Sequence, residues 1–209
     1  MRQLVVEPHY FPSIEYFCAL LPAQSILFEK HEHYIKQSFR NRCYINTPQG
    51  TFMLVVPVVH TIENKIPFHQ VNIDYSSNWT HHHWQSIQTA YGKAPFFEFY
   101  ADELHNVLDQ KIEKLYDLNL NFLSLCLRWL KLEVHISETV TYEKRLDSSK
   151  DDLRSKISPK IPYSGRSFYT DAPYPQVFGS KFVPNLSFLD LLFCEGPRSL
   201  EILKASKKD

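Results

Sequence analysis

A carboxylate, an imidazole and a phenol stand close together near the start of the chain, at Glu7, His9 and Tyr10. Residues 4–6 form an aliphatic run that predicts a buried strand, so these side chains would lie in the loop where the strand ends. A loop histidine that titrates near neutral pH can act as acid or base, with Tyr10 as a second candidate. Glu7 would orient the His9 ring, as a carboxylate does in a catalytic triad. The alternative is a histidine that is hydrogen-bonded in the core.

Two arginines flank an asparagine at Arg40, Asn41 and Arg42. Residues 39–46 read as a strand, in which alternate side chains share a face, so both guanidinium groups would point the same way. Side by side they repel each other and favour a common anion, such as the pyrophosphate of a nucleotide-sugar. The alternative is a solvated pair on an edge strand, bridged to Asp or Glu side chains.

Three consecutive histidines, His81, His82 and His83, open a predicted helix over residues 78–91. Adjacent helical residues do not face each other, so the run does not form a ready metal site. His83 shares a helix face with Ile87 and should lean toward the core, while His81 and His82 should lean outward. We therefore expect no metal, and we place His82 at the helix start as a residue that lines the substrate pocket. A structural metal is the alternative.

Three further polar residues are predicted to contact substrate. Tyr91 ends the same predicted helix, and Gln176 lies in a proline-rich loop, where polar residues commonly touch a ligand. Asp190 lies in an apolar helical segment, and an isolated buried carboxylate is prohibitively unfavourable. The natural partner for Asp190 would be Arg40 or Arg42.

Composition limits the remaining possibilities. The 209 residues carry a formal net charge of +0 and a pI near 7.1, so their charge does not indicate binding to nucleic acid or to an anionic membrane. The chain contains no GxGxxG or GxxxxGK[ST] motif and no HExxH motif, so the cofactor is left open. The four cysteines are scattered and should be reduced, buried thiols. There is no signal-peptide pattern and no apolar run long enough to span a membrane, so we expect a cytoplasmic protein.

The order of segments predicts a single-domain α/β fold over residues 1–209. A mixed β-sheet would come mainly from the first half, with helices from the second half packed on it. The predicted strands are residues 4–6, 25–28, 39–46, 51–59, 66–73 and 132–137. The predicted helices are residues 13–21, 78–91, 101–116, 118–130, 188–195 and 198–205, with Asn185 or Ser187 capping the fifth. Residues 143–162 are charged and should form a mobile excursion with at most a short helix.

The whole pattern resembles the WbqC-like family of bacterial polysaccharide-cluster proteins. The matching segments are residues 7–12 with 16–17, 38–42, 55–58, 79 with 81–83, 90–97, 174–178, 184–193 and 195–197. The family usually has Gln where Glu7 stands, which puts any shared amide contact at this position in question.

The resemblance implies a role in making O-antigen or a similar surface polysaccharide. From it and the residues above we expect an enzyme that uses a small, activated, phosphate-bearing donor, such as a nucleotide-sugar. One alternative is a binding or assembly protein that uses its exposed aromatic residues to meet a protein partner. A second alternative is a nucleotidyl or adenylyl transferase, since residues 8–12 loosely resemble the HxGH loop of such enzymes.

Overall fold

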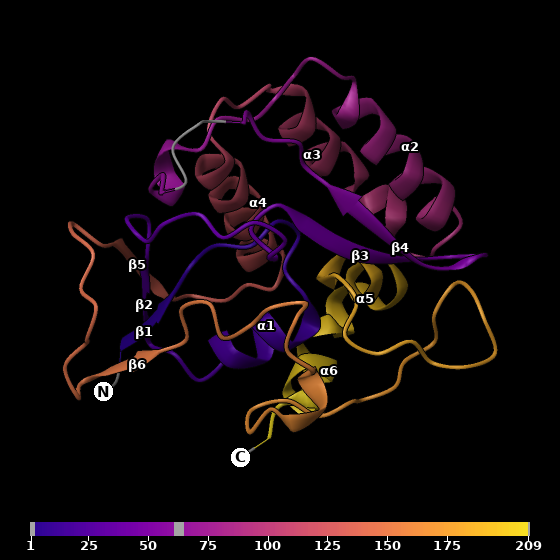
Figure 1. The fold of residues 1–209 in the computed structure, drawn as a ribbon. Coiled ribbons are helices and arrows are strands. Elements are labelled where there is room, and N and C mark those ends of the chain that lie inside the picture. Colours follow the sequence, from indigo (N-terminus) through magenta and orange to yellow (C-terminus); the bar gives the residue numbers. More distant parts are fainter. Residues whose placement is uncertain (1–2, 61–64, 209) are drawn as a thin grey trace.

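A small parallel sheet forms one side of the molecule. The computed structural model describes residues 3–60 and 65–208. The sheet has the order β5-β2-β1-β6, and all three neighbouring pairs are parallel. Its strands are β1 (Gln3–Val6), β2 (Ser25–Phe28), β5 (His135–Glu138) and β6 (Lys150–Asp152). Helix α1 (Ile14–Leu20) connects β1 to β2, and the later strands are added on opposite sides of this pair (Figure 1). The strand order therefore reverses between β1 and β6.

An antiparallel hairpin forms a second, separate sheet. Strands β3 (Arg42–Thr47) and β4 (Gly50–Val55) pair from Arg42 opposite Val55 to Thr47 opposite Gly50. Gly50 has a φ of +104°, a conformation that favours glycine at the turn. Because side chains alternate along a strand, one face of the hairpin buries Cys43, Ile45 and Leu54, and the other face carries Tyr44 and Thr51.

Helices cover both sides of this hairpin, as Figure 1 shows. On one side lie α2 (Trp79–Tyr91), α3 (Phe97–Asp109) and α4 (Leu115–Trp129). On the other lies α5 (Phe188–Glu195), which is followed by α6 (Ser199–Ser206) and packs with it against α1. Short 3₁₀ turns occur at η1 (Phe68–Gln70), η2 (Tyr163–Gly165) and η3 (Gly196–Arg198). Among the described residues, no helix combines the length and the apolar character needed to cross a membrane.

Aromatic side chains join these layers into one core. Phe122 of α4 is completely buried and lies 4.1 Å from Phe11 and 5.7 Å from Tyr10, measured between ring centroids. Phe17 of α1 packs on Phe188 of α5 at 4.6 Å. The predicted single-domain α/β class is confirmed, with its strands divided between two sheets.

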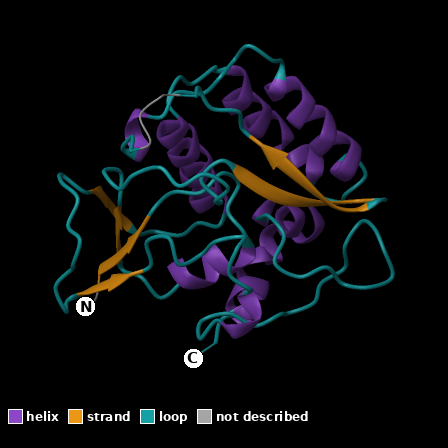
Figure 2. Ribbon diagram, in the orientation of Figure 1, coloured by secondary structure: helices purple, strands orange, loops and turns teal. Residues whose placement is uncertain are grey.

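One predicted strand is wrong, and one strand was not predicted. Residues 66–73 form the turn η1 and isolated bridges instead of a strand, because no neighbouring strand pairs along them. Residues 143–162 contain no α-helix; they contain β6, which pairs with β1. A short strand at the edge of a sheet tolerates charged side chains, so β6 could not be predicted from its amino-acid composition. Figure 2 shows that the chain between β6 and α5 is almost entirely loop.

Candidate functional site

Polar side chains gather where the parallel strands end. Glu7 follows β1, Glu29 follows β2, Thr139 follows β5, and Arg154 and Ser155 come just after β6. Because the strands are parallel, all four carboxyl ends lie at the same edge of the sheet. Open α/β sheets bind ligands at this edge, at the point where the strand order reverses, which here lies between β1 and β6.

Glu7 is the centre of the first cluster. Its side chain is only 2% exposed, and its Oε1 lies 3.5 Å from Nε2 of His9 and 3.6 Å from Nη2 of Arg40. The backbone N–H of Ser155 donates to both carboxylate oxygens, at 2.9 and 3.2 Å. Burial raises the pKa of Glu7, but the positive charge of Arg40 and these hydrogen bonds outweigh it and lower the pKa to about 2. Glu7 is therefore ionised at neutral pH.

Arg40 is completely buried beside Glu7. Its guanidinium donates to the carboxylate of Glu32, to the carbonyl of His33 at 2.8 Å and to Oγ of Ser155 at 3.0 Å. It also lies over the ring of Phe68, 5.1 Å from the centroid. These contacts come from the protein itself, so the groups that neutralise Arg40 are two internal carboxylates.

Arg42 does not share a strand face with Arg40, because Arg40 lies in the turn that precedes β3. Arg42 is half-buried at the start of β3, and its Nε has no hydrogen-bond partner among the described residues. Asn41 donates from Nδ2 to the carbonyl of Val56 at 3.0 Å and thus links the start of the hairpin to its end. Whether the two arginines hold an anion together stays a prediction.

His9 is nearly inaccessible, with 1% of its side chain exposed. Its ring packs 4.5 Å from Tyr16 and 5.6 Å from Phe39, measured between centroids. One ring nitrogen faces Glu7, and Nδ1 has no partner within the described part of the chain. A buried, unpartnered nitrogen on a ring that a carboxylate orients is a group that can exchange a proton once a substrate reaches it.

Tyr10 points away from Glu7 toward α2. Its hydroxyl lies 2.8 Å from Nδ1 of His83, and both side chains are buried. Burial raises the pKa of Tyr10 and lowers the pKa of His83 to about 4, so at pH 7 the neutral ring accepts a hydrogen bond from the phenol O–H. The predicted orientation of the histidine run is confirmed: His83 faces the core, whereas His81 and His82 are exposed.

A second buried cluster surrounds Asp190. This carboxylate is fully buried and accepts hydrogen bonds from Tyr91 at 2.9 Å, Tyr174 at 2.6 Å and Gln176 at 2.9 Å. The predicted pairing of Asp190 with one of the two arginines before or at β3 is wrong, because these three neutral donors satisfy it instead. Burial raises the pKa of Asp190, and the three hydrogen bonds oppose that effect. The cluster is built by α2, α5 and the loop before α5.

A cavity of about 440 Å³ lies beyond Phe39, and neither His9 nor Arg40 is among the residues that line it. Phe39, which packs on the His9 ring, lines it together with Tyr44 and Thr51 of the hairpin, and the loops 158–163 and 183–186 complete the wall. The buried carboxylate of Glu15 also lines it.

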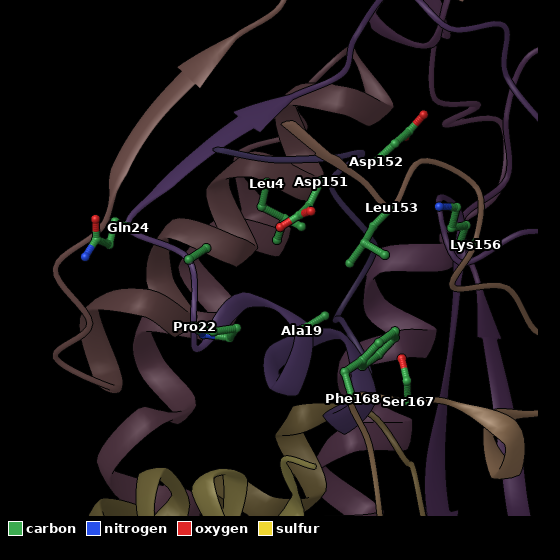
Figure 3. Close-up of a pocket in the computed structure, with 11 residues that line it drawn as sticks. Leu4, Ala19, Pro22, Gln24, Asp151, Asp152, Leu153, Lys156, Ser167 and Phe168 are labelled. Carbon is green, nitrogen blue, oxygen red and sulfur yellow. The ribbon is translucent and has the colours of Figure 1, made fainter. Parts of the chain in front are cut away.

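A second cavity, of about 570 Å³, lies beside α1 and β6 (Figure 3). Leu4, Leu153 and Phe168 form its apolar part. Gln24, just before β2, and Lys156, after β6, both line it, so this cavity extends along β6, and Glu7 is not among its lining residues. Within residues 3–60 and 65–208, no group of His, Cys, Asp or Glu side chains is arranged to hold a metal ion.

Comparison with known proteins identifies the family. The model of the WbqC-like protein family matches residues 7–164 and 166–202. The chain belongs to this family. It is 26% identical over 230 residues to "Uncharacterized protein Rv1507c" of Mycobacterium tuberculosis (strain ATCC 25618 / H37Rv), covering 96% of each chain. No solved structure matches the chain with significance.

Several polar residues of this WbqC-like chain were not predicted from its sequence. Arg154 donates to Glu29 at 3.2 Å and to Asp152 at 2.8 Å, and Glu29 is fully buried. A signal for Glu29 was present, since it follows the strand 25–28 just as Glu7 follows 4–6. For Ser155 no signal existed, because nothing in the sequence marked β6 as a strand.

Proposed function

We propose that this chain is a cytoplasmic enzyme of bacterial surface-polysaccharide biosynthesis, such as O-antigen assembly, that acts on an activated, phosphate-bearing sugar or group donor. Membership of the WbqC-like family supports the pathway. The observation that carries the catalytic part is the position of His9 at the carboxyl edge of a parallel sheet. Its ring is oriented by Glu7, and its buried Nδ1 has no partner among the residues that the structure describes.

In this proposal His9 exchanges a proton with the substrate, and Glu7 holds the imidazole ring in place. The donor lies in the cavity lined by Phe39 and Tyr44, where aromatic walls suit a ring-shaped group. Arg40 acts indirectly, because two carboxylates already neutralise it. Arg42, on the same hairpin face as Tyr44, supplies the guanidinium for the phosphate.

The remaining predicted contacts take different parts in this proposal. His82 is exposed at the start of α2 and is not among the residues that line this cavity, so its contact with the donor stays a prediction. Tyr91 and Gln176 act through Asp190, which fixes the loop before α5 and thereby the far wall of the cavity.

A thermal-shift screen tests the proposal. The ligands are nucleoside-diphosphate sugars, ATP, acyl-coenzyme A thioesters and sulfate, and the ATP arm tests the adenylyl-transfer alternative. A ligand at about one hundred times its Kd stabilises the folded state by about 2.7 kcal/mol, which raises the midpoint by roughly 5–10 °C for a chain of this size. The Arg42→Met variant should lose most of the shift. Arg198→Met is the matched control, because Arg198 is 70% exposed at α6. A flat response to every phosphate-bearing compound would contradict the proposal.

A non-catalytic binding protein is the second candidate, because apolar side chains are exposed on and near the hairpin. Phe52 is 49% exposed and Met53 is 40% exposed on β4, and Val59 is 45% exposed shortly after it. Phe52 and Met53 are adjacent on β4 and point to opposite faces of the hairpin, and exposed apolar side chains on either face can mark a protein interface. A Phe52→Ser, Met53→Ser double variant that keeps every ligand-induced thermal shift but loses a partner in pull-down experiments would favour this candidate.

A further inference from the structure

Ser155 adopts a backbone conformation that is unusual for a serine. Its φ is +56°, in the left-handed region that costs a residue with a Cβ atom about 1–2 kcal/mol. The conformation is held by the backbone N–H of Ser155, which donates to both carboxylate oxygens of Glu7. Residues kept in strained conformations by their surroundings cluster at functional sites.

The hydroxyl of Ser155 lies between a carboxylate and a guanidinium. Its Oγ is 3.1 Å from Oε2 of Glu32, to which it donates, and it accepts from Nη2 of Arg40 at 3.0 Å. Ser155 is partly exposed, whereas Arg40 is completely buried. Glu32 is partly exposed as well, so a substrate can approach this cluster from the side of Ser155 and Glu32. A serine becomes nucleophilic when an adjacent base takes its proton, and Glu32 is within reach to do so.

We propose that Ser155 is a nucleophile that carries an acyl group taken from a thioester donor. This inference rests on the proposed function and narrows its activated donor to an acyl donor. Oγ of Ser155 attacks the thioester carbonyl carbon, and its proton passes to Glu32. The C–S bond breaks, the electron pair leaves on sulfur, and the thiolate takes the proton from Glu32. The product of this half-reaction is an acyl ester on Ser155 and a free thiol.

The second half-reaction returns the enzyme to its starting state. An acceptor hydroxyl or amine gives its proton to Glu32 and attacks the ester carbonyl carbon. The bond between that carbon and Oγ of Ser155 breaks, and Oγ takes the proton back from Glu32. Arg40, hydrogen-bonded to Oγ, stabilises the negative charge that builds on this oxygen as its proton leaves in the first half-reaction and as its ester bond breaks in the second.

Charge favours an acyl group over a phosphoryl group at Ser155. Glu7 and Glu32 both lie against the single guanidinium of Arg40, so these three side chains carry a formal charge of −1 when ionised. A phosphoryl group brings further negative charge to a partly buried site, where like charges repel strongly. The carbonyl group of an acyl donor is neutral, so transfer of an acyl group to Ser155 avoids this repulsion.

Covalent labelling tests the inference. The intact chain is incubated separately with a fluorophosphonate probe and with acetyl-coenzyme A, then digested and analysed by mass spectrometry. We expect both adducts on the peptide that contains Ser155 and none in the Ser155→Ala variant. Ser148→Ala is the matched control, because Ser148 is an exposed serine in the turn just before β6, and it should be labelled like the unaltered chain. Glu32→Gln should slow labelling at least tenfold, and Glu32→Asp, which keeps a carboxylate, provides a second variant should the first not fold.

The outcomes separate this inference from the proposed function. A folded chain that shifts its melting midpoint with phosphate-bearing donors but gains no adduct on Ser155 overturns the nucleophile alone, and leaves the hydroxyl as a link between β6 and the loop at Glu32. Labelling that Glu32→Gln and Glu32→Asp leave unchanged also overturns it. Labelling of Ser155 by the fluorophosphonate but not by acetyl-coenzyme A, without any ligand-induced thermal shift, overturns both the acyl donor and the phosphate-bearing donor and leaves only a reactive serine.

Discussion

Replacing Glu7 by Gln should remove a charge that stabilises the fold, and should change how stability depends on pH. The amide keeps the shape of the side chain and an oxygen for the N–H of Ser155, but Arg40 loses one of its two carboxylates. The pKa of Glu7 falls from an ordinary 4.5 to about 2 in the folded chain. At about 1.4 kcal/mol for each pKa unit, the charged form contributes about 3 kcal/mol at pH 7.

The sign of the pH effect follows from the direction of that change in pKa. Because the folded pKa lies below the ordinary value, the contribution of Glu7 is complete well above pH 4.5 and is lost as pH falls toward 2. By pH 3 roughly 2 kcal/mol of it is gone. The difference in unfolding free energy between the unaltered chain and Glu7→Gln should thus shrink from about 3 kcal/mol at pH 7 to about 1 kcal/mol at pH 3.

Urea unfolding at pH 7, 5 and 3, followed by circular dichroism, measures this difference. Glu201→Gln is the control, because Glu201 is exposed on α6, and it should match the unaltered chain at each pH. If the unaltered chain and Glu7→Gln lose the same stability between pH 7 and pH 3, then the carboxylate of Glu7 is not the group whose ionisation Arg40 stabilises.

Three further changes test other parts of the fold by the same unfolding assay. Ser155→Gly should be about 1 kcal/mol more stable than Ser155→Ala, since glycine adopts a φ of +56° without strain, and equal stabilities would argue against a strained residue. Gly196→Ala should lower the unfolding free energy by about 1–3 kcal/mol, because φ at Gly196 is +52° and an added Cβ would lie 2.4 Å from the ring of Phe96. Gly165→Ala is its control and should change the unfolding free energy little, because no atom lies within 4 Å of a Cβ added there. Tyr174→Phe should cost about 1–2 kcal/mol, because it removes a donor from the buried carboxylate of α5, and an unchanged midpoint would show that water replaces the hydroxyl.

Elements with strong local signals were predictable from the sequence. The aliphatic runs at residues 4–6 and 25–28 give β1 and β2, which are buried and so lack polar alternation. The hairpin follows from the turn at residues 47–50, and α5 from the apolar run that Ser187 caps by accepting from the N–H of Leu189. In each case a few neighbouring residues determine the conformation.

Helix boundaries without capping signals were not predictable. The structure has α3 at Phe97–Asp109 and α4 at Leu115–Trp129, whereas the sequence predicted helices over residues 101–116 and 118–130. Neither helix has a side-chain hydrogen bond at its N-cap, where Phe96 and Lys114 stand. These ends are set by packing of the aromatic and leucine side chains, which local sequence does not reveal.

Part of the candidate site followed from the same local reasoning. Glu7 and His9 were expected at the end of a strand, and the structure places them there with Arg40 beside them. The partner of Asp190 was not predictable, because a buried carboxylate can be satisfied by one cation or by several neutral donors. Sequence shows that a partner is needed, but the choice depends on which loops the fold brings near, and here they bring two tyrosines and a glutamine.

The charged strand β6 explains why Arg154 and Ser155 could not be predicted as part of the site. Its three residues are Lys150, Asp151 and Asp152, and it is a strand only because its backbone pairs with β1. That pairing places Arg154 and Ser155 at the carboxyl edge, where Arg154 meets the carboxylate that follows β2 and Ser155 meets the one that follows β1. The strand therefore contributes by position, not by burial of its side chains. Polar residues that directly follow a short charged segment are poor candidates by composition alone, yet here they complete the polar edge at the point where the strand order reverses.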